Sequence, residues 1–303
     1  MGLDTLDLPR LGHRIAGDIR ARLRDRLVAQ GGGETLLDPA NLKSAHAIDR
    51  HAADAARRAL RGESCRIHIE GEASGGAGDA SFCVYIDPVD GSLNWDRGIG
   101  DPAFVLAAGR GASITTLDGL ELAYVEGLRS GDRYYTLGDE AVYWNALTQT
   151  RVTLACRGPG RLDAATGYLR CGYGGARAQL EHTLALFLAA RDLRAVDNAG
   201  TELAEIARNA ADFMVEARGI SDGYNLLAWP ILRAAGGVLL DLDGAELAPQ
   251  PFAPAAASDF VAANDPRLAA AVVAAMDAGR ARSRACLDAL AGHGDRPGGA
   301  GDG

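Results

Sequence analysis

Two aspartates stand three residues apart in the stretch 87–95, which reads DPVDGSLNW. Asp87 and Asp90 flank a Pro-Val pair, and Gly91 follows, so a turn can bring both carboxylates and the Val89 carbonyl toward one point. Hard oxygen ligands on a short loop suit Mg²⁺, which keeps some waters and shares its coordination shell with substrate phosphate. Alternatively, the two aspartates accept hydrogen bonds from backbone NH groups of an Asx-type turn. The pattern therefore predicts either a magnesium site or a self-contained turn.

Two predicted strands position these acids. An uncharged, β-rich run at 82–86 indicates a buried strand that ends at the following Asp-Pro pair, and the alternating run 66–69 indicates another. The second run leads into Glu70 and Glu72, and the glycine-rich segment 75–80 is expected to join the two strands as a hairpin. Glu72 would then lie beside the two aspartates. The alternative is that both glutamates are exposed loop acids.

The stretch 87–95 resembles the D-P-[ILV]-D-G-[ST]-x-N-[FW] signature of the inositol monophosphatase family. These are Mg²⁺-dependent, lithium-sensitive phosphomonoesterases that include archaeal-type fructose-bisphosphatases. The segment 98–105 is similar to the family's G-x-P-x-F-x-V continuation, with two extra residues before the proline. Shorter similarities lie at 44–49, 70–74, 197–204, 211–217, 229–244 and 260–264. The resemblance thus extends over about 49–266, most of the chain.

The resemblance implies the roles of particular residues. It implies that Mg²⁺ is held by Glu72, Asp87, the Val89 carbonyl and Asp90, and that Ser92, with Asp49 and Glu72, orients and deprotonates the attacking water. It also implies substrate contacts from Asp90, Gly91, Ser92, Gly200 and Thr201. Two alternatives stay open: Asp49 as a first-turn acid favoured by the helix dipole, and Thr201 as a helix N-cap.

One departure from the family concerns its third metal-binding aspartate, which opens the helix before A-G-G. Counting back from Gly237 without a gap puts Tyr224 there, and a one-residue shortening puts Asn225 there. We take Asn225 as the expected ligand; its carbonyl oxygen carries no charge, so a second metal would bind more weakly. Asp222, two residues before Tyr224, is the alternative. An altered or lost reaction also stays possible.

The resemblance implies an α/β fold with α+β layering, an αβαβα sandwich of the sugar-phosphatase type with two closely packed subdomains. We expect an N-terminal α+β metal-binding subdomain at 8–153, a C-terminal α/β subdomain at 154–280 and a disordered tail at 292–303. Hydrophobic periodicity by itself predicts helices at 11–28, 46–60, 176–190 and 266–276. The first of these is expected to end at the glycines 31–33.

Composition limits the classes of partner. The 303 residues are 48% hydrophobic and carry a formal net charge of -9, which argues against nucleic-acid binding because nothing offsets phosphate repulsion. The five widely spaced cysteines indicate reduced thiols, and no segment approaches the about 18 apolar residues of a membrane span. We therefore expect a cytoplasmic protein with a small phosphorylated metabolite as partner and no membrane. The family resemblance adds the expectation of a homodimer.

These observations predict a Mg²⁺-dependent phosphomonoesterase that hydrolyses a small phosphorylated polyol, sugar or related metabolite by attack of a metal-activated water. One rival is a phosphate-ligand-binding homologue without catalysis, in which the third acid is lost. Another is a phosphatase specialised for a secondary-metabolite intermediate. The joint presence of Glu72, Asp87, Asp90 and Ser92 favours an enzyme, because a binding protein does not need a set that activates water.

Overall fold

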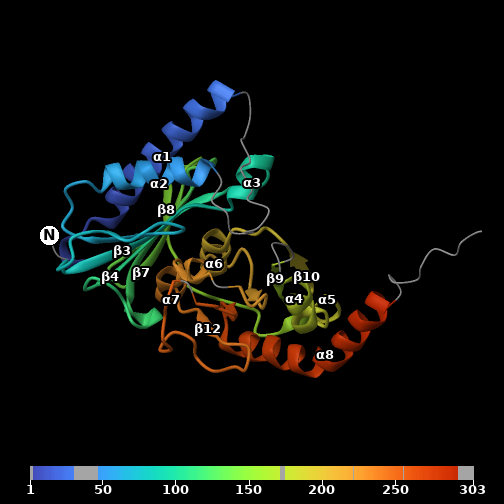
Figure 1. Ribbon diagram of the computed structural model, residues 1–303. Helices are drawn as coiled ribbons and strands as arrows, with labels where there is room; N and C mark the ends of the chain where they lie inside the picture. The colour runs from blue at the N-terminus through green and yellow to red at the C-terminus, as the bar shows by residue number, and fades with distance from the viewer. Residues whose placement is uncertain (1–2, 31–46, 171–174, 221, 255, 293–303) are drawn as a thin grey trace, which may run out of the picture.

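Two β-sheets alternate with three layers of helices (Figure 1). The computed structural model describes residues 3–30, 47–170, 175–220, 222–254 and 256–292. In the described residues, helices α1 (Leu8–Gln30) and α2 (Ala47–Ala59) cover the outer face of the first sheet, and α6 (Ala199–Ala207) and α7 (Trp229–Ala234) lie between the sheets. Helices α4 (Ala176–Thr183), α5 (Leu186–Ala189) and α8 (Pro266–Gly292) cover the outer face of the second sheet. This arrangement confirms the predicted αβαβα sandwich.

The first sheet has the strand order β2-β1-β3-β4-β5-β6-β7-β8. Its strands are β1 (Arg66–Ile69), β2 (Gly75–Gly76), β3 (Phe82–Asp90), β4 (Ala103–Arg110), β5 (Leu120–Gly127), β6 (Arg133–Leu137), β7 (Glu140–Asn145) and β8 (Thr150–Thr153). From β3 to β8 each strand pairs antiparallel with the next along the chain, so this part of the sheet is a meander.

The second sheet has the order β10-β9-β11-β13-β12. Its strands are β9 (Thr166–Leu169), β10 (Asp192–Arg194), β11 (Phe213–Glu216), β12 (Val238–Leu240) and β13 (Phe260–Ala263). Strands β10, β9 and β11 are parallel, whereas β13 is antiparallel to both of its neighbours. The carboxyl ends of three strands therefore meet at one edge of this sheet.

The connection from β1 to β3 differs from the predicted hairpin. β1 pairs with β3 in parallel, with Ile69 opposite Ile86, while the glycine pair of β2 forms a short antiparallel strand on the other side of β1. The glycine-rich segment therefore folds back beside β1 and crosses over before β3 begins. The prediction that β3 ends at Ile86 was also wrong, because the strand continues to Asp90 through a bulge.

Three helices differ from their predicted limits. The predicted helix 176–190 is divided into α4 and α5, and α8 continues past residue 276 to Gly292. The segment after Asp222 begins as the 3-10 turn η4 (Gly223–Leu226), and α7 starts only at Trp229, with Pro230 in its first turn. The helix end predicted at 31–33 and nearly all of the predicted tail lie outside the described residues, and the subdomain limits stay predictions.

Helix α1 is attached to the first sheet by an apolar stripe and by one buried acid. Leu11, Ile15, Ile19 and Leu23 recur every fourth residue and are all buried, and each contributes roughly 1.5 to 3 kcal/mol of burial free energy. Besides η4, the described residues include the short 3-10 turns η1 (Leu3–Thr5), η2 (Leu117–Gly119) and η3 (Leu162–Ala164). None of the helices in the described part of the chain has the length and apolar content of a transmembrane span.

The buried acid is Glu126 on β5. Its carboxylate accepts hydrogen bonds from Arg20, from the Tyr124 hydroxyl and, at 3.0 Å, from His13 Nδ1, so two side chains of α1 bind one fully buried group. Hydrogen bonds to a charged partner are stronger than neutral ones.

We predict that Glu126→Gln lowers the free energy of unfolding by about 2 kcal/mol, because the neutral amide weakens the hydrogen bonds that join α1 to β5. Denaturant titration measures this loss. Glu140→Gln is the matched control, since Glu140 is exposed and lies 3.8 Å from Arg151. Equal stability of the Glu126 variant and the wild type would show that the buried acid does not hold the helix.

Candidate functional site

The bulge in β3 decides which side chains face the interior between the sheets. Before it, side chains alternate as in any strand: Tyr85 lies in the core between the sheets, whereas Val84 and Ile86 lie in the core under α1 and α2. Unbroken alternation would turn Asp87 inward but Asp90 outward. The register shift between these two residues inserts one extra position.

Both aspartates consequently face the inner layer. Asp87 pairs with Val105 and Asp90 with Ala103, and both partners on β4 belong to the core between the sheets. Val89, inside the bulge, instead packs into the outer core. The three-residue spacing in the sequence therefore becomes two carboxylates on one face.

Asp90 is held by the amino end of α6. Its Oδ1 accepts the Ala199 NH at 3.1 Å and its Oδ2 accepts the Gly200 NH at 2.8 Å. Burial raises the pKa of Asp90 to about 7, and the charge of Arg170 opposes this rise. A Cβ on Gly200 would stand 2.5 Å from Val105 Cγ2, so only a glycine lets the amino end of α6 lie this close to β4.

The turn after Asp90 packs closely against the loop that precedes α6. Gly91 has φ +82, and a Cβ there would lie 1.8 Å from Asn198 Oδ1. Asn94 Nδ2 donates to Asn198 Oδ1 at 2.8 Å and to the Val196 carbonyl at 2.6 Å. The helix α3 (Ser92–Arg97), which begins with Ser92, is thereby fixed to the second sheet's side of the molecule.

Burial and the negative charges of four other carboxylates raise the pKa of Asp87. Burial raises its pKa well above the ordinary value, and the charges of Glu70, Asp90, Asp49 and Asp222 raise it further. We call these five residues the acid group. Asp87 Oδ1 also accepts the Val89 NH at 3.0 Å, so the Asx turn, left open as an alternative, is present together with the convergence of acids.

Glu72 forms an ion pair, since its carboxylate lies 2.8 Å from Arg57 Nη2. Its NH donates to the Ile69 carbonyl in the turn after β1. Glu70 follows β1 directly, and its NH donates to the Ile86 carbonyl, so the parallel pairing brings it next to Asp87. The structure thus adds Glu70 to the candidate carboxylates, and the ligand role of Glu72 stays a prediction.

Asp222, the alternative to Asn225, is one of the carboxylates whose charge acts on Asp87. Its charge also acts on Tyr224, whose pKa is raised by burial and then by Glu70, Tyr85, Asp87 and Asp222. Asn225, the expected ligand, is buried in the 3-10 turn.

Thr201 does not cap α6, because Asn198 occupies the N-cap position. The Thr201 Oγ1 atom is buried and has no hydrogen-bond partner among the described residues. The substrate contact predicted for Thr201 stays a prediction.

The donor set fits a hard divalent cation by its chemistry. Mutual repulsion among buried carboxylates is relieved when a cation binds between them, and carboxylate oxygens are the ligands that Mg²⁺ prefers. Within the described ranges no three His, Cys, Asp or Glu side chains form a ready-made cage. The acid group thus offers the right ligand type without a closed coordination shell.

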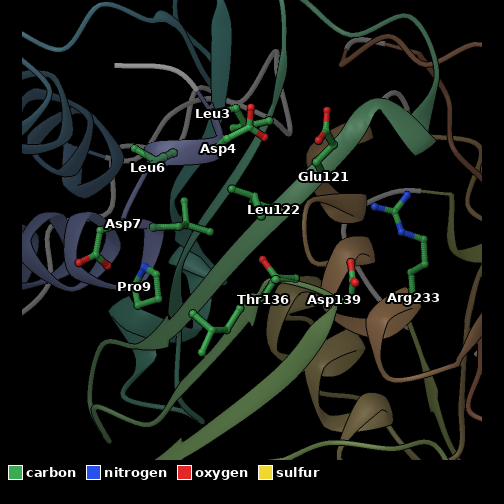
Figure 2. A pocket seen from close by; sticks show the side chains of 13 residues that line it. Leu3, Asp4, Leu6, Asp7, Pro9, Glu121, Leu122, Thr136, Asp139 and Arg233 are labelled. Carbon is green, nitrogen blue, oxygen red and sulfur yellow. The ribbon is translucent and has the colours of Figure 1, made fainter.

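A pocket of about 700 Å³ lies elsewhere, between the chain's first described turn, strands β5 and β6, and Arg233 of α7. Figure 2 shows Leu3, Asp4 and Leu6 on one side of it and Glu121 and Leu122 on β5. It shares no residue with the acid group.

One curated protein and several solved structures are similar to this chain. No protein-family model matches the chain. A curated Archaeoglobus fulgidus protein, named fructose-1,6-bisphosphatase/inositol-1-monophosphatase, is 35% identical over 138 residues, which are 44% of this chain and 50% of the relative. The match thus spans half the length of that relative.

Solved structures extend the similarity to nearly the whole chain. The Thermotoga maritima IMPase superposes with a TM-score of 0.71 at 18% identity, over 93% of this chain and 100% of that one. The inositol monophosphatase from Anabaena gives 0.66 at 16% identity, over 88% and 93%. These structures show that the chain has the fold of the inositol monophosphatases. This confirms the resemblance drawn from residues 87–95.

The raised pKa of Asp90 makes the stability of this inositol monophosphatase homologue depend on pH in an unusual direction. An acid whose pKa rises from 3.8 to about 7 on folding binds its proton more tightly in the native state, so stability falls as pH rises through that window. Without divalent cations, we predict that the free energy of unfolding attributable to Asp90 is lower at pH 8 than at pH 5 by on the order of 2 kcal/mol.

Added Mg²⁺ should reduce this loss, because the cation stabilises the ionised carboxylate. Denaturant titrations at both pH values, with and without Mg²⁺, measure the effect, and Asp90→Asn is the control that lacks the titrating group. If wild type and Asp90→Asn have the same pH dependence, Asp90 is not the group responsible.

Proposed function

We propose that this protein is a Mg²⁺-dependent phosphomonoesterase that releases inorganic phosphate from a small phosphorylated polyol, sugar or related metabolite. The observation that carries the proposal is the bulge in β3, which turns Asp87 and Asp90 inward beside Glu70, Asp49 and Asp222. Two neighbouring acids with raised pKa values, Asp87 and Asp90, are typical of a functional site such as one for metal-assisted chemistry. The relative's name and the shared fold support the same class of reaction.

In this proposal Asp87, Asp90, the Val89 carbonyl and Glu70 hold Mg²⁺, with Asp222 as a further ligand. Glu70 is proposed beside the predicted ligand Glu72, whose carboxylate is paired with Arg57. When bound, the ion polarises the phosphoryl group and lowers the pKa of a coordinated water.

The remaining residues orient the reactants. Asp49, in the first turn of α2, and Ser92, at the start of α3, position the water and accept its proton. Gly91, Gly200 and the unpartnered hydroxyl of Thr201 contact the substrate. No covalent intermediate is required. The homodimeric state and cytoplasmic location predicted from the sequence stay predictions.

The first test is phosphate release from a panel of inositol, fructose, histidinol and nucleotide phosphates, with and without Mg²⁺. We expect Mg²⁺-dependent release from at least one ester, and a loss of more than about tenfold in Asp90→Asn, which corresponds to about 1.4 kcal/mol in the barrier. Asp163→Asn is the control, because Asp163 is exposed and paired only to neighbouring Arg161. Binding without hydrolysis across the panel would favour the non-catalytic rival.

The identity of the additional carboxylate ligand is tested by the Mg²⁺ dependence of the rate. Because Asp222 lies among the charges acting on Asp87, Asp222→Asn should raise the Mg²⁺ concentration for half-maximal rate by about tenfold or more. Asn225→Asp should leave it unchanged or destabilise the fold, since Asn225 is buried in η4. A lower Mg²⁺ requirement in Asn225→Asp would instead make position 225 the ligand site.

A further inference from the structure

The second sheet presents a group of charged residues at the carboxyl ends of its parallel strands. Arg170 follows β9, Asp197 follows β10, and Glu216 ends β11. The chain leaves β9 through α4 and α5 on the outer face, and it reaches β11 through α6 on the inner face. A change of direction of this kind opens a crevice at the carboxyl ends of the strands, where ligands of α/β proteins bind.

Five side chains form what we call the ionic cluster: Arg170, Asp197, Glu202, Glu216 and Arg218. Arg170 Nε lies 2.8 Å from Asp197 Oδ1, and its Nη1 lies 3.0 Å from Glu202 Oε2. Arg218 Nη2 lies 2.6 Å from Glu216 Oε2. The two guanidinium groups are therefore already engaged by carboxylates from three segments.

Asp197 is the one member of the ionic cluster that reaches solvent. Its side chain is 31% exposed, whereas the exposed fractions of the other four are 6% or less. It has φ 68, a left-handed conformation that aspartate tolerates, and it immediately precedes Asn198 and the Ala199 NH that binds Asp90. Its charge also acts on Asp90. The exposed carboxylate thus stands beside the proposed phosphate site.

The charges of the ionic cluster sum to one negative unit, from three carboxylates and two guanidinium groups. In a buried setting an unbalanced negative charge repels anions more strongly than in water. A carboxylate accepts hydrogen bonds from hydroxyl or ammonium groups and has no donor for a phosphate or carboxylate oxygen.

From this arrangement, and resting on the proposed function, we propose that Asp197 selects the organic part of the substrate. The preferred ester carries hydroxyl or ammonium groups and a single phosphate, and a second anionic group is rejected. The relative's name joins a bisphosphatase and a monophosphatase activity; for this chain the ionic cluster favours the monophosphate.

The test compares inositol 1-phosphate with fructose 1,6-bisphosphate on wild type, Asp197→Asn, Asp197→Glu and the control Asp192→Asn. Asp192 is 35% exposed and pairs with Arg194, outside the ionic cluster. We expect wild type to favour the monophosphate in kcat/KM by at least about tenfold. Asp197→Asn, whose cluster is neutral, should lose most of that preference, whereas Asp197→Glu and Asp192→Asn should retain it.

Binding of both esters to the same substitutions in a Ser92→Ala background, measured by calorimetry, gives a readout independent of turnover. Thermal unfolding verifies that each variant is folded. Tighter monophosphate binding that depends on Asp197 would support the selection even if no ester is hydrolysed, in which case the proposed function alone fails. Hydrolysis with equal kcat/KM for the two esters, or a preference unchanged in folded Asp197→Asn, would overturn the inference and leave the proposed function standing. Absence of binding and hydrolysis for both esters would overturn both.

Discussion

The hydrogen bonds from α6 to Asp90 are the interaction on which the rest of the site depends. Asp90 belongs to the first sheet, whereas Ala199 and Gly200 begin the helix that leads into the second. A carboxylate at a helix amino end satisfies NH groups that have no partner within the helix, and it is favoured by the helix dipole. One buried side chain therefore joins the two sheets and also stands in the acid group.

The position of Asp90 between the two sheets explains why particular residue types are needed around it. Gly91 and Gly200 must lack a side chain, because a Cβ at either would meet Asn198 or Val105 at under 3 Å. Asn198 in turn bridges Asn94 and the Asp101 carbonyl, so the loop after β3 and the loop before α6 form one unit. The signature stretch is therefore a packing motif as well as a set of ligands.

The layered fold and the central pair of aspartates could be predicted because the resemblance that implies the fold, and the pair itself, both lie in the contiguous stretch 87–95. Helical spacing in α1 and the Asp-Pro-Val-Asp-Gly turn are visible without tertiary contacts. The position of Glu70 beside Asp87 was not predictable locally, because it depends on β1 being parallel to β3, which the glycine-rich connection did not reveal. The ionic cluster was missed for the same reason, since its members come from four segments of the chain that meet only at the carboxyl edge of the second sheet.

The missing third aspartate has a structural explanation in the way the chain enters α7. In this chain the 3-10 turn η4 comes first, and the α-helix starts only at Trp229, with Pro230 in its first turn. A 3-10 turn rises further per residue than an α-helix and rotates its side chains differently, so residues near its start do not occupy α-helical positions. Asp222, just before η4, lies among the charges acting on Asp87, and the charges of Glu70, Asp87 and Asp222 also act on Tyr224. A carboxylate two residues before Tyr224 thus acts on Asp87, and its role as a metal ligand stays a prediction.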